Sequence, residues 1–440
     1  MLRIFDVETA RQGILKRKPI DDYSVPAVVS ERLKALFGRK ITPQDAVAQI
    51  LRDVRNDGDA SLLRWSAALD GKAPEKLRVP ASELQAARDA LPDNLRTAIQ
   101  QSIERVRAFH QRQPLTSWIS QDLGGTLGQL IRPIRRVGLY IPAGTSPLPS
   151  TAIMSAVPAQ VAGVKEIVLA APPDRATGKI SPIILATAAL LGLDEVYVMG
   201  GAQAVAALAY GTQSVAAVDK IFGPGNLFVT LAKKQVFGTV GIDGLAGPTE
   251  TVVVADENAR PAWVAADLLA QAEHDLLASA ILLTPSRSLA EAVAVEVKKQ
   301  AAMLSRSEII SASLGANSGA VVTNSMDEAV ALANAYGPEH LCLAVKDPWL
   351  WVEKVTCAGG IFLGEYSFEV LGDYVAGPSH VMPTSATARF ASPLNILDFV
   401  RIISLIGLNE ETARQIASTA SDLAHAEGLD GHARAAEMRL

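Results

Sequence analysis

Short apolar runs alternate with longer stretches of helical periodicity through most of the chain from about residue 133. The runs at 137–141, 166–170 and 195–199 are almost wholly apolar, and an alanine-rich stretch with helical spacing follows each of them. Strands without polar alternation are buried on both faces, which is typical of a parallel sheet between two helix layers. The pattern therefore predicts repeated strand–helix–strand units.

Two such series follow one another, the first near 130–245 and the second near 246–380. The second series has its expected strands at 251–256, 278–283 and 320–323. Residues 30–112 before them have mainly helical periodicity, and the stretch from about 388 onward is also expected to be helical. The predicted fold class is α/β, with two doubly wound, Rossmann-like parallel-sheet domains between a helical N-terminal region and a helical C-terminal tail.

Composition narrows the class of protein. The 440 residues are 49% hydrophobic and 20% charged with a formal charge of −5, so neither nucleic acid nor an anionic membrane is an expected partner. Two cysteines are too few for a disulfide framework. The longest apolar stretch, 182–193, is too short to span a bilayer, and the first residues do not resemble a signal peptide. A cytoplasmic enzyme is expected.

Histidine is rare in this chain, and its distribution is uneven. Only six histidines occur, and four of them lie in short segments that also hold carboxylates or amides: 271–274, 337–340, 372–380 and 427–432. Nitrogen and oxygen ligands of this kind suit a zinc-class ion.

Two of these segments allow both a chemical and a structural interpretation. Gln271 and His274 stand three residues apart at the end of a predicted helix, on one face, which provides half of a metal site or simply a polar helix end. Glu339 and His340 follow a Gly-Pro turn, where an adjacent acid and imidazole suit a proton relay. An exposed polar turn explains the second pair about equally well.

The other two segments are similarly open. Asp373 lies in a loop with two glycines and a proline, as a metal ligand or as an Asx-turn residue. His432 lies nine residues from the end, so a functional role requires the tail to dock, for instance on a partner subunit.

Glycine-rich loops at 200–203 and 223–226 each open a predicted helix. Free helix N–H groups at such a junction suit a phosphate or nucleotide. Neither loop matches the G-x-G-x-x-G fingerprint, so a tight strand-to-helix turn is the competing interpretation.

Taken together, the ordered motifs resemble those of the histidinol dehydrogenase family, from about residue 30 to the end. The resemblance is densest at 137–142, 200–204, 221–226, 246–250, 271–274, 336–341, 372–374 and 427–432.

The resemblance implies a role for particular residues. One zinc ion per subunit would be held by Gln271, His274, Asp373 and His432. The acid–base pair would be Glu339 and His340. Besides His340 and the zinc ligands, the substrate would contact Thr249, His380 and Glu427. The cofactor NAD would contact Tyr140, Gln203 and Asn226.

The implied reaction is the oxidation of L-histidinol to L-histidine through L-histidinal, with two NAD reduced in turn, as the last step of histidine biosynthesis. The implied partner is a second copy of the chain, a homodimer in which each C-terminal tail completes the other subunit's site. The implied domains are an N-terminal extension at 1–29, a first α/β domain from 30–129 and 246–385, a second from 130–245, and the exchanged tail at 386–440.

Besides a zinc hydrolase, which would not need the loops at 200–203 and 223–226, two other functions compete with this one. The first is a zinc- and NAD-dependent dehydrogenase of another small polar alcohol, such as a sulfonated diol. The second is a non-catalytic α/β metal-binding protein, against which the intact Glu339-His340 pair argues, because a scaffold needs no proton relay.

Overall fold

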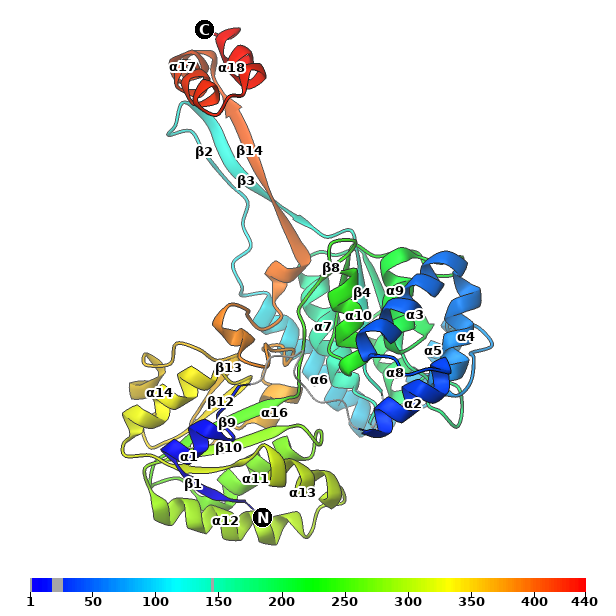
Figure 1. Cartoon of the computed structure of the whole chain (residues 1–440), viewed down its shortest axis with the longest axis vertical. Helices are drawn as coiled ribbons and strands as arrows, with labels where there is room; N and C mark the ends of the chain where they lie inside the picture. Colours follow the sequence, from blue (N-terminus) through cyan, green and yellow to red (C-terminus); the bar gives the residue numbers. More distant parts are fainter. Residues whose placement is uncertain (1, 18–26, 144–145) are drawn as a thin grey trace.

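The computed structural model describes residues 2–17, 27–143 and 146–440. Two α/β bodies lie side by side, and a long arm projects away from them with the C-terminal helices at its tip (Figure 1). None of the described helices is long and apolar enough to cross a membrane.

The first body is built on a six-stranded sheet, here called the large sheet, in which all neighbouring strands are parallel. Its strands, in spatial order, are β1 (Ile4–Asp6), β11 (Gly319–Val322), β10 (Ser279–Thr284), β9 (Glu250–Ala255), β12 (His340–Ala344) and β13 (Gly360–Leu363). Its two faces are covered by α11 (Pro261–Ala272), α12 (Arg287–Ala301) and α13 (Ser307–Ala316) on one side, and α1 (Val7–Gln12) and α14 (Met326–Tyr336) on the other.

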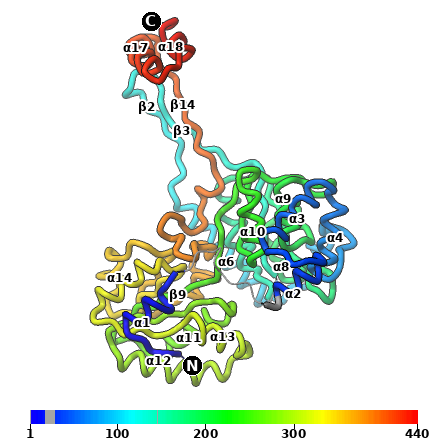
Figure 2. The backbone as a smooth tube through the Cα atoms, in the orientation of Figure 1, coloured from blue at the N-terminus to red at the C-terminus, as the bar shows by residue number. Residues whose placement is uncertain are grey.

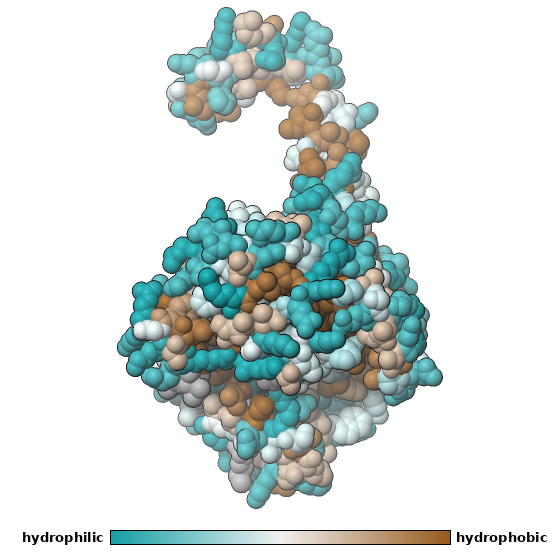
Figure 3. Space-filling model, turned by 90° about the vertical axis from the view of Figure 1, so that its right-hand side faces the viewer, coloured by the Kyte–Doolittle hydropathy of each residue, from teal (hydrophilic) through white to brown (hydrophobic). Residues whose placement is uncertain are grey.

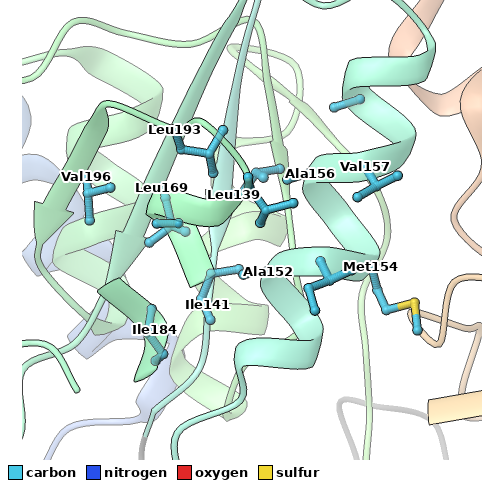
Figure 4. Packing of buried hydrophobic residues seen from close by; sticks show 14 of the residues in the cluster. Leu139, Ile141, Ala152, Met154, Ala156, Val157, Leu169, Ile184, Leu193 and Val196 are labelled. Carbon is cyan, nitrogen blue, oxygen red and sulfur yellow. The ribbon is translucent and has the colours of Figure 1, made fainter. Parts of the chain in front are cut away.

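The second body holds a five-stranded parallel sheet, here called the small sheet. Its strands, in spatial order, are β6 (Glu195–Val198), β5 (Glu166–Ala171), β4 (Arg136–Tyr140), β7 (Lys220–Phe222) and β8 (Gly241–Ile242). The covering helices are α7 (Pro149–Val161) and α8 (Pro182–Leu190) on one face, and α9 (Gly201–Tyr210) and α10 (Leu227–Val236) on the other. Figure 4 shows one layer of this core, where Leu139 of β4 and Ile141 lie beside Ala152 and Ala156 of α7.

Both sheets are wound in the same order. The first strand of each series is central, the next two extend to one side, and the last two extend to the other. The order reverses between β9 and β12 in the large sheet and between β4 and β7 in the small one. The two expected parallel-sheet units are thus confirmed. Strands β4, β5, β6, β9, β10 and β11 lie within about a residue of the predicted runs, whereas β7, β8, β12 and β13 were not among the predicted strands.

The N-terminal segments differ from the expected domain grouping, which placed 30–129 with 246–385. Helices α3 (Pro43–Asp57) and α4 (Asp59–Asp70) pack on α9, and α5 (Ala81–Asp89) packs on α8, so all three belong to the small-sheet body. The reason is the apolar stripe of α3, whose buried residues join the core that covers the outer face of the small sheet. Residues 4–6, expected in an extension, instead form the edge strand β1 of the large sheet.

Two further N-terminal helices complete this region. Helix α2 (Ala27–Phe37) contacts α3, and α6 (Asp93–His110) packs on α7. Helix α6 also reaches the other body, because Ser102 and Arg105 donate hydrogen bonds to the carbonyls of Tyr374 and Val375.

The arm also differs from expectation, because the tail is not helical throughout. Strand β14 (Val400–Leu408) pairs antiparallel with the whole of β3 (Gly125–Pro133), and β2 (Trp118–Ser120) pairs with the other side of β3. Isoleucine and valine in 400–408 favour an extended strand. The helices α17 (Glu410–Ala426) and α18 (Asp430–Glu437) follow at the tip (Figures 1 and 2).

Candidate active site

The predicted metal and proton-transfer residues gather at the amino edge of the large sheet. Thr249 directly precedes β9, and Glu339 and His340 open the neighbouring strand β12. A helix between two parallel strands returns the chain to the amino edge. The C-terminal end of α11 therefore brings Gln271 and His274 to the same place.

Glu339 is a buried carboxylate held in a fixed position. Its Oε2 accepts a hydrogen bond of 2.5 Å from the hydroxyl of Thr249 and one of 3.1 Å from the backbone N–H of Glu250. Burial raises the pKa of Glu339 to about 7, although His340 and these hydrogen bonds act in the opposite direction. A carboxyl with this pKa can both accept and donate a proton near neutral pH.

His340 is 4% exposed and faces three carboxylates. Its Nδ1 lies 3.8 Å from Glu339 Oε2 and 3.7 Å from Oε1 of Glu369, while its Nε2 lies 3.9 Å from Oδ1 of Asp373. Neither ring nitrogen has a hydrogen-bond partner among the residues that the structure describes. Buried polar atoms are rarely left so, and an imidazole in this state is available to a bound molecule.

Gln271 is likewise a buried polar side chain without a hydrogen-bond partner in the described structure. It is 0% exposed, and within residues 2–17, 27–143 and 146–440 neither its amide oxygen nor its amide nitrogen finds a partner. Burial lowers the pKa of the neighbouring His274, while the charge of Asp373 raises it less, so the imidazole is kept in the neutral form that binds metals. An amide oxygen, an imidazole and a carboxylate fit a zinc-class ion.

The described residues contain no group of three or more His, Cys, Asp or Glu side chains able to hold a metal ion. The predicted zinc ligands at this edge are His274, Asp373 and the amide of Gln271. The remaining predicted ligand, His432, lies elsewhere in this structure.

His380 joins the two bodies. Its Nδ1 lies 2.9 Å from the backbone oxygen of Asp373, and its Nε2 lies 3.3 Å from the hydroxyl of Thr151 in α7. Burial lowers the pKa of His380, which keeps the ring neutral. Thr151 stands at the start of α7, just after β4, so the carboxyl edge of the small sheet meets the amino edge of the large one.

Glu427 and His432 are not brought to this place by their own chain. Glu427 ends α17 and His432 lies within α18, and both side chains are exposed at the tip of the arm. The arm holds them well away from both sheets (Figure 1).

The predicted cofactor residues line the carboxyl edge of the small sheet. Tyr140 ends β4, and its hydroxyl accepts a hydrogen bond of 3.2 Å from the N–H of Gly201. Gly223 follows β7, and a Cβ there would lie 2.0 Å from the carbonyl oxygen of Tyr140, so only glycine fits. This close approach lies between β4 and β7, at the point where the strand order reverses.

Two amide side chains lie at the starts of the neighbouring helices α9 and α10. The Nε2 of Gln203 donates to Oδ2 of Asp70 at 3.0 Å, whereas its buried Oε1 is without a partner in the described part of the chain. Asn226 caps α10, accepting hydrogen bonds from the N–H groups of Phe228 and Val229. The orphaned amide oxygen and the two helix N-termini fit a dinucleotide.

Sequence reasoning missed two acidic residues. Glu369 accepts a hydrogen bond from Thr251, and burial raises its pKa well above the usual value. It precedes Asp373 by one helical turn, a spacing that provided a signal. Asp70, whose pKa burial raises to about 6, gave no signal, because its contact with Gln203 joins distant parts of the chain.

One edge carries glycines and helix N-termini that fit a nucleotide, and it contacts an edge that holds buried proton-transferring groups. This is the arrangement of a dinucleotide-dependent dehydrogenase. Comparison with known proteins gives the family. The family model described as histidinol dehydrogenase matches residues 39–440.

Similar proteins agree with this match. A histidinol dehydrogenase of Deinococcus radiodurans is 54% identical over 94% of this chain and 95% of its own length, and one of Moorella thermoacetica is 50% identical over 94% and 99%. The crystal structure of a histidinol dehydrogenase from Elizabethkingia anophelis is 34% identical, with a TM-score of 0.90 over 100% of this chain and 98% of that one. The chain belongs to the histidinol dehydrogenase family, which confirms the resemblance and the oxidoreductase class.

Proposed function

We propose that this chain oxidises L-histidinol to L-histidine through L-histidinal, in the cytoplasm, reducing two molecules of NAD per substrate as the last step of histidine biosynthesis. One observation carries the proposal most directly. In this member of the family, the ring nitrogens of His340, which lies next to Glu339, and the amide of Gln271 are buried without partners among the described residues. Polar atoms in that state are built for a ligand.

The proton-handling residues have distinct tasks. His340 removes the proton of the substrate hydroxyl as hydride leaves for the nicotinamide, since its ring nitrogens have no competing partner in the described structure. Glu339 then removes a proton from the water that attacks the aldehyde. Its pKa of about 7 makes it a base at neutral pH that also returns the proton readily. The hydroxyl of Thr249 holds that carboxylate in place as well as bordering the substrate.

Zinc, one ion per subunit, would be held by Gln271, His274, Asp373 and His432, and would supply a positive anchor for the imidazole and amine of the substrate. His380 fixes the backbone at Asp373 and borders the same space. At the other edge, Tyr140, Gln203 and Asn226 would contact NAD, with Gln203 offering its free amide oxygen.

The fourth ligand requires a second copy of the chain. Glu427 and His432 lie exposed at the arm's tip, too far to reach their own site (Figure 1). The arm also carries the exposed apolar side chains Trp118, Ile119, Ile402, Ile403 and Ile406. Figure 3 shows brown, hydrophobic surface along the arm. Such a surface favours burial against another protein. We therefore propose a homodimer in which each arm completes the partner's site.

Counting NADH per molecule of substrate tests the function. Purified protein with zinc, NAD and L-histidinol should form about two NADH per histidinol, with little free aldehyde, if one site performs both oxidations. A ratio near one with accumulating aldehyde would contradict the two-step reaction. Turnover of another polar alcohol but not of L-histidinol would favour the alternative dehydrogenase, and no turnover at all the non-catalytic protein.

A further inference from the structure

Arg17, in the N-terminal segment, binds residues that adjoin the candidate active site. Residues 4–6 add strand β1 to the large sheet, α1 follows, and Arg17 then reaches the amino edge of the central strands. Its guanidinium forms a two-pronged ion pair with Glu250, with Nη2 at 2.7 Å from Oε2 and Nη1 bonded to Oε1. The matched family region begins at residue 39, so Arg17 lies before it.

The same guanidinium binds a second segment. Its Nε donates to the carbonyl of Tyr336 at 2.7 Å, and its Nη2 donates to the carbonyl of Gly337 at 3.1 Å. The guanidinium also stacks 3.5 Å above the ring of Tyr336. Carbonyls at the end of a helix lack partners within that helix, and a cation there is favourable. Arg17 thus fixes the turn that delivers Glu339 and His340.

Glu250 links Arg17 to Glu339. The Glu250 side chain is 3% exposed, and it also accepts a hydrogen bond of 3.1 Å from the backbone N–H of Ser385. The backbone N–H of Glu250 is one of the two groups that hold the Glu339 carboxylate. One guanidinium therefore fixes both the residue that anchors Glu339 and the turn that carries it.

We propose that Arg17 is a positioning residue for the acid–base pair Glu339 and His340, acting through Glu250 and the 336–337 turn. This inference rests on the proposed function. Arg17 does not touch the reacting atoms. It supplies a planar fork that binds a carboxylate with two parallel bonds while keeping Nε for a carbonyl, which the single ammonium of lysine cannot reproduce. Small misplacements of catalytic groups are costly, of the order of 10²-fold for about 1 Å.

The test compares Arg17→Ala and Arg17→Lys with Arg11→Ala, which removes an exposed arginine from the same N-terminal segment. We expect kcat to fall about 10- to 100-fold in both Arg17 variants, with the KM for L-histidinol and the zinc content little changed. Arg11→Ala should match the unsubstituted protein. Millimolar guanidinium should restore part of kcat in Arg17→Ala and none in His340→Ala. Rates are compared well below each variant's Tm, per folded protein.

The pH profile separates positioning from a purely structural role. In Arg17→Ala the residue Glu250 is no longer fixed, so the hydrogen bond from its backbone N–H, which lowers the pKa of Glu339, is weakened and the acid limb of kcat should move to higher pH. Unchanged kcat per folded protein, or a loss without any shift of the limb and without guanidinium rescue, would overturn the inference. Should Arg17→Ala not fold, Arg17→Lys carries the same expectation for kcat. If the unsubstituted protein forms no NADH from L-histidinol, the proposed function fails and the inference with it.

Discussion

The two sheets share one winding order but use opposite edges. In the small sheet the candidate cofactor residues stand at the carboxyl edge, where α9 and α10 begin, and helix N-termini carry partial positive charge that suits phosphate. In the large sheet the candidate zinc residues stand at the amino edge, where α11 ends, and helix C-termini carry partial negative charge that suits a cation. The same architecture would thus suit an anion at one edge and a cation at the other.

The contact between the two bodies brings these two edges together. His380 and Thr151 meet across the boundary, so the carboxyl edge of one sheet faces the amino edge of the other. A hydride donor held at one edge and an acceptor held at the other would then be close together. If the edges are independent sites, a change at one edge should leave ligand binding at the other intact.

The largest effect is expected from the proton-handling edge. His340→Ala should lower kcat by about 10²-fold or more, the usual consequence of losing a general base, with zinc content and the KM for NAD almost unchanged. Steady-state kinetics and metal analysis measure these quantities. Loss of zinc in His340→Ala would mean that this histidine is a ligand.

The next prediction concerns a site assembled from two chains. His274→Ala and His432→Ala should each be inactive, because each removes one zinc ligand. When the two variants are mixed and allowed to exchange subunits, activity should return to roughly a quarter of the original, since about half of the dimers are hybrids with one intact site each. Mixtures that exchange subunits, shown by mass spectrometry, and remain inactive would mean that His432 serves its own chain or is not a ligand.

A smaller effect is expected at the cofactor edge. Gln203→Ala removes the free amide oxygen and should raise the KM for NAD about tenfold, equivalent to about 1.4 kcal/mol, with zinc content unchanged. Gln415→Ala, on the exposed side of α17, provides a control glutamine. If zinc content falls along with NAD affinity, the two edges are not independent.

The smallest effect concerns stability and pH. The folded-state pKa of Asp70 is raised by burial from 3.8 to about 6, so the protonated form is favoured on folding. The contribution of Asp70 to the free energy of unfolding is fully present below about pH 4. It is lost as the pH rises through about 6, by at most about 3 kcal/mol. In Asp70→Asn this pH dependence should vanish, while the bond from Gln203 can persist. Urea unfolding at pH 4.5 and 7.5 measures both proteins, and an identical pH dependence would contradict the assignment.

The parts of this molecule that were predicted from sequence share one physical cause. Strands such as β4, β5 and β9 are buried on both faces, so their continuous apolar runs identify them. Strand β14 is exposed on both faces, so no clean alternation of apolar and polar residues marks it, and its apolar residues were equally compatible with a helix. The packing of α3 on the small sheet was missed because an amphipathic stripe shows that a face is buried but not against what.

The same distinction holds for the site. Rare histidines and motif order placed His274 and His340, because their residue types alone carry chemistry. Arg17 resembles any other arginine in sequence, and its role depends on contacts with residues more than 200 positions away. Such long-range pairs become visible only in three dimensions.

The arm has a consequence for the timing of assembly. Residue 133 of β3 pairs with residue 400 of β14, so a ribosome working at about 5–20 residues per second needs on the order of 15–50 seconds to supply the partner strand. Until then β3 has only the three-residue pairing with β2, and a ribbon of that size is barely stable in water. Both sheets can therefore fold during synthesis, whereas the arm closes only when translation is almost complete. If each arm completes the partner's site as proposed, catalytic competence is the last property that a newly made chain acquires.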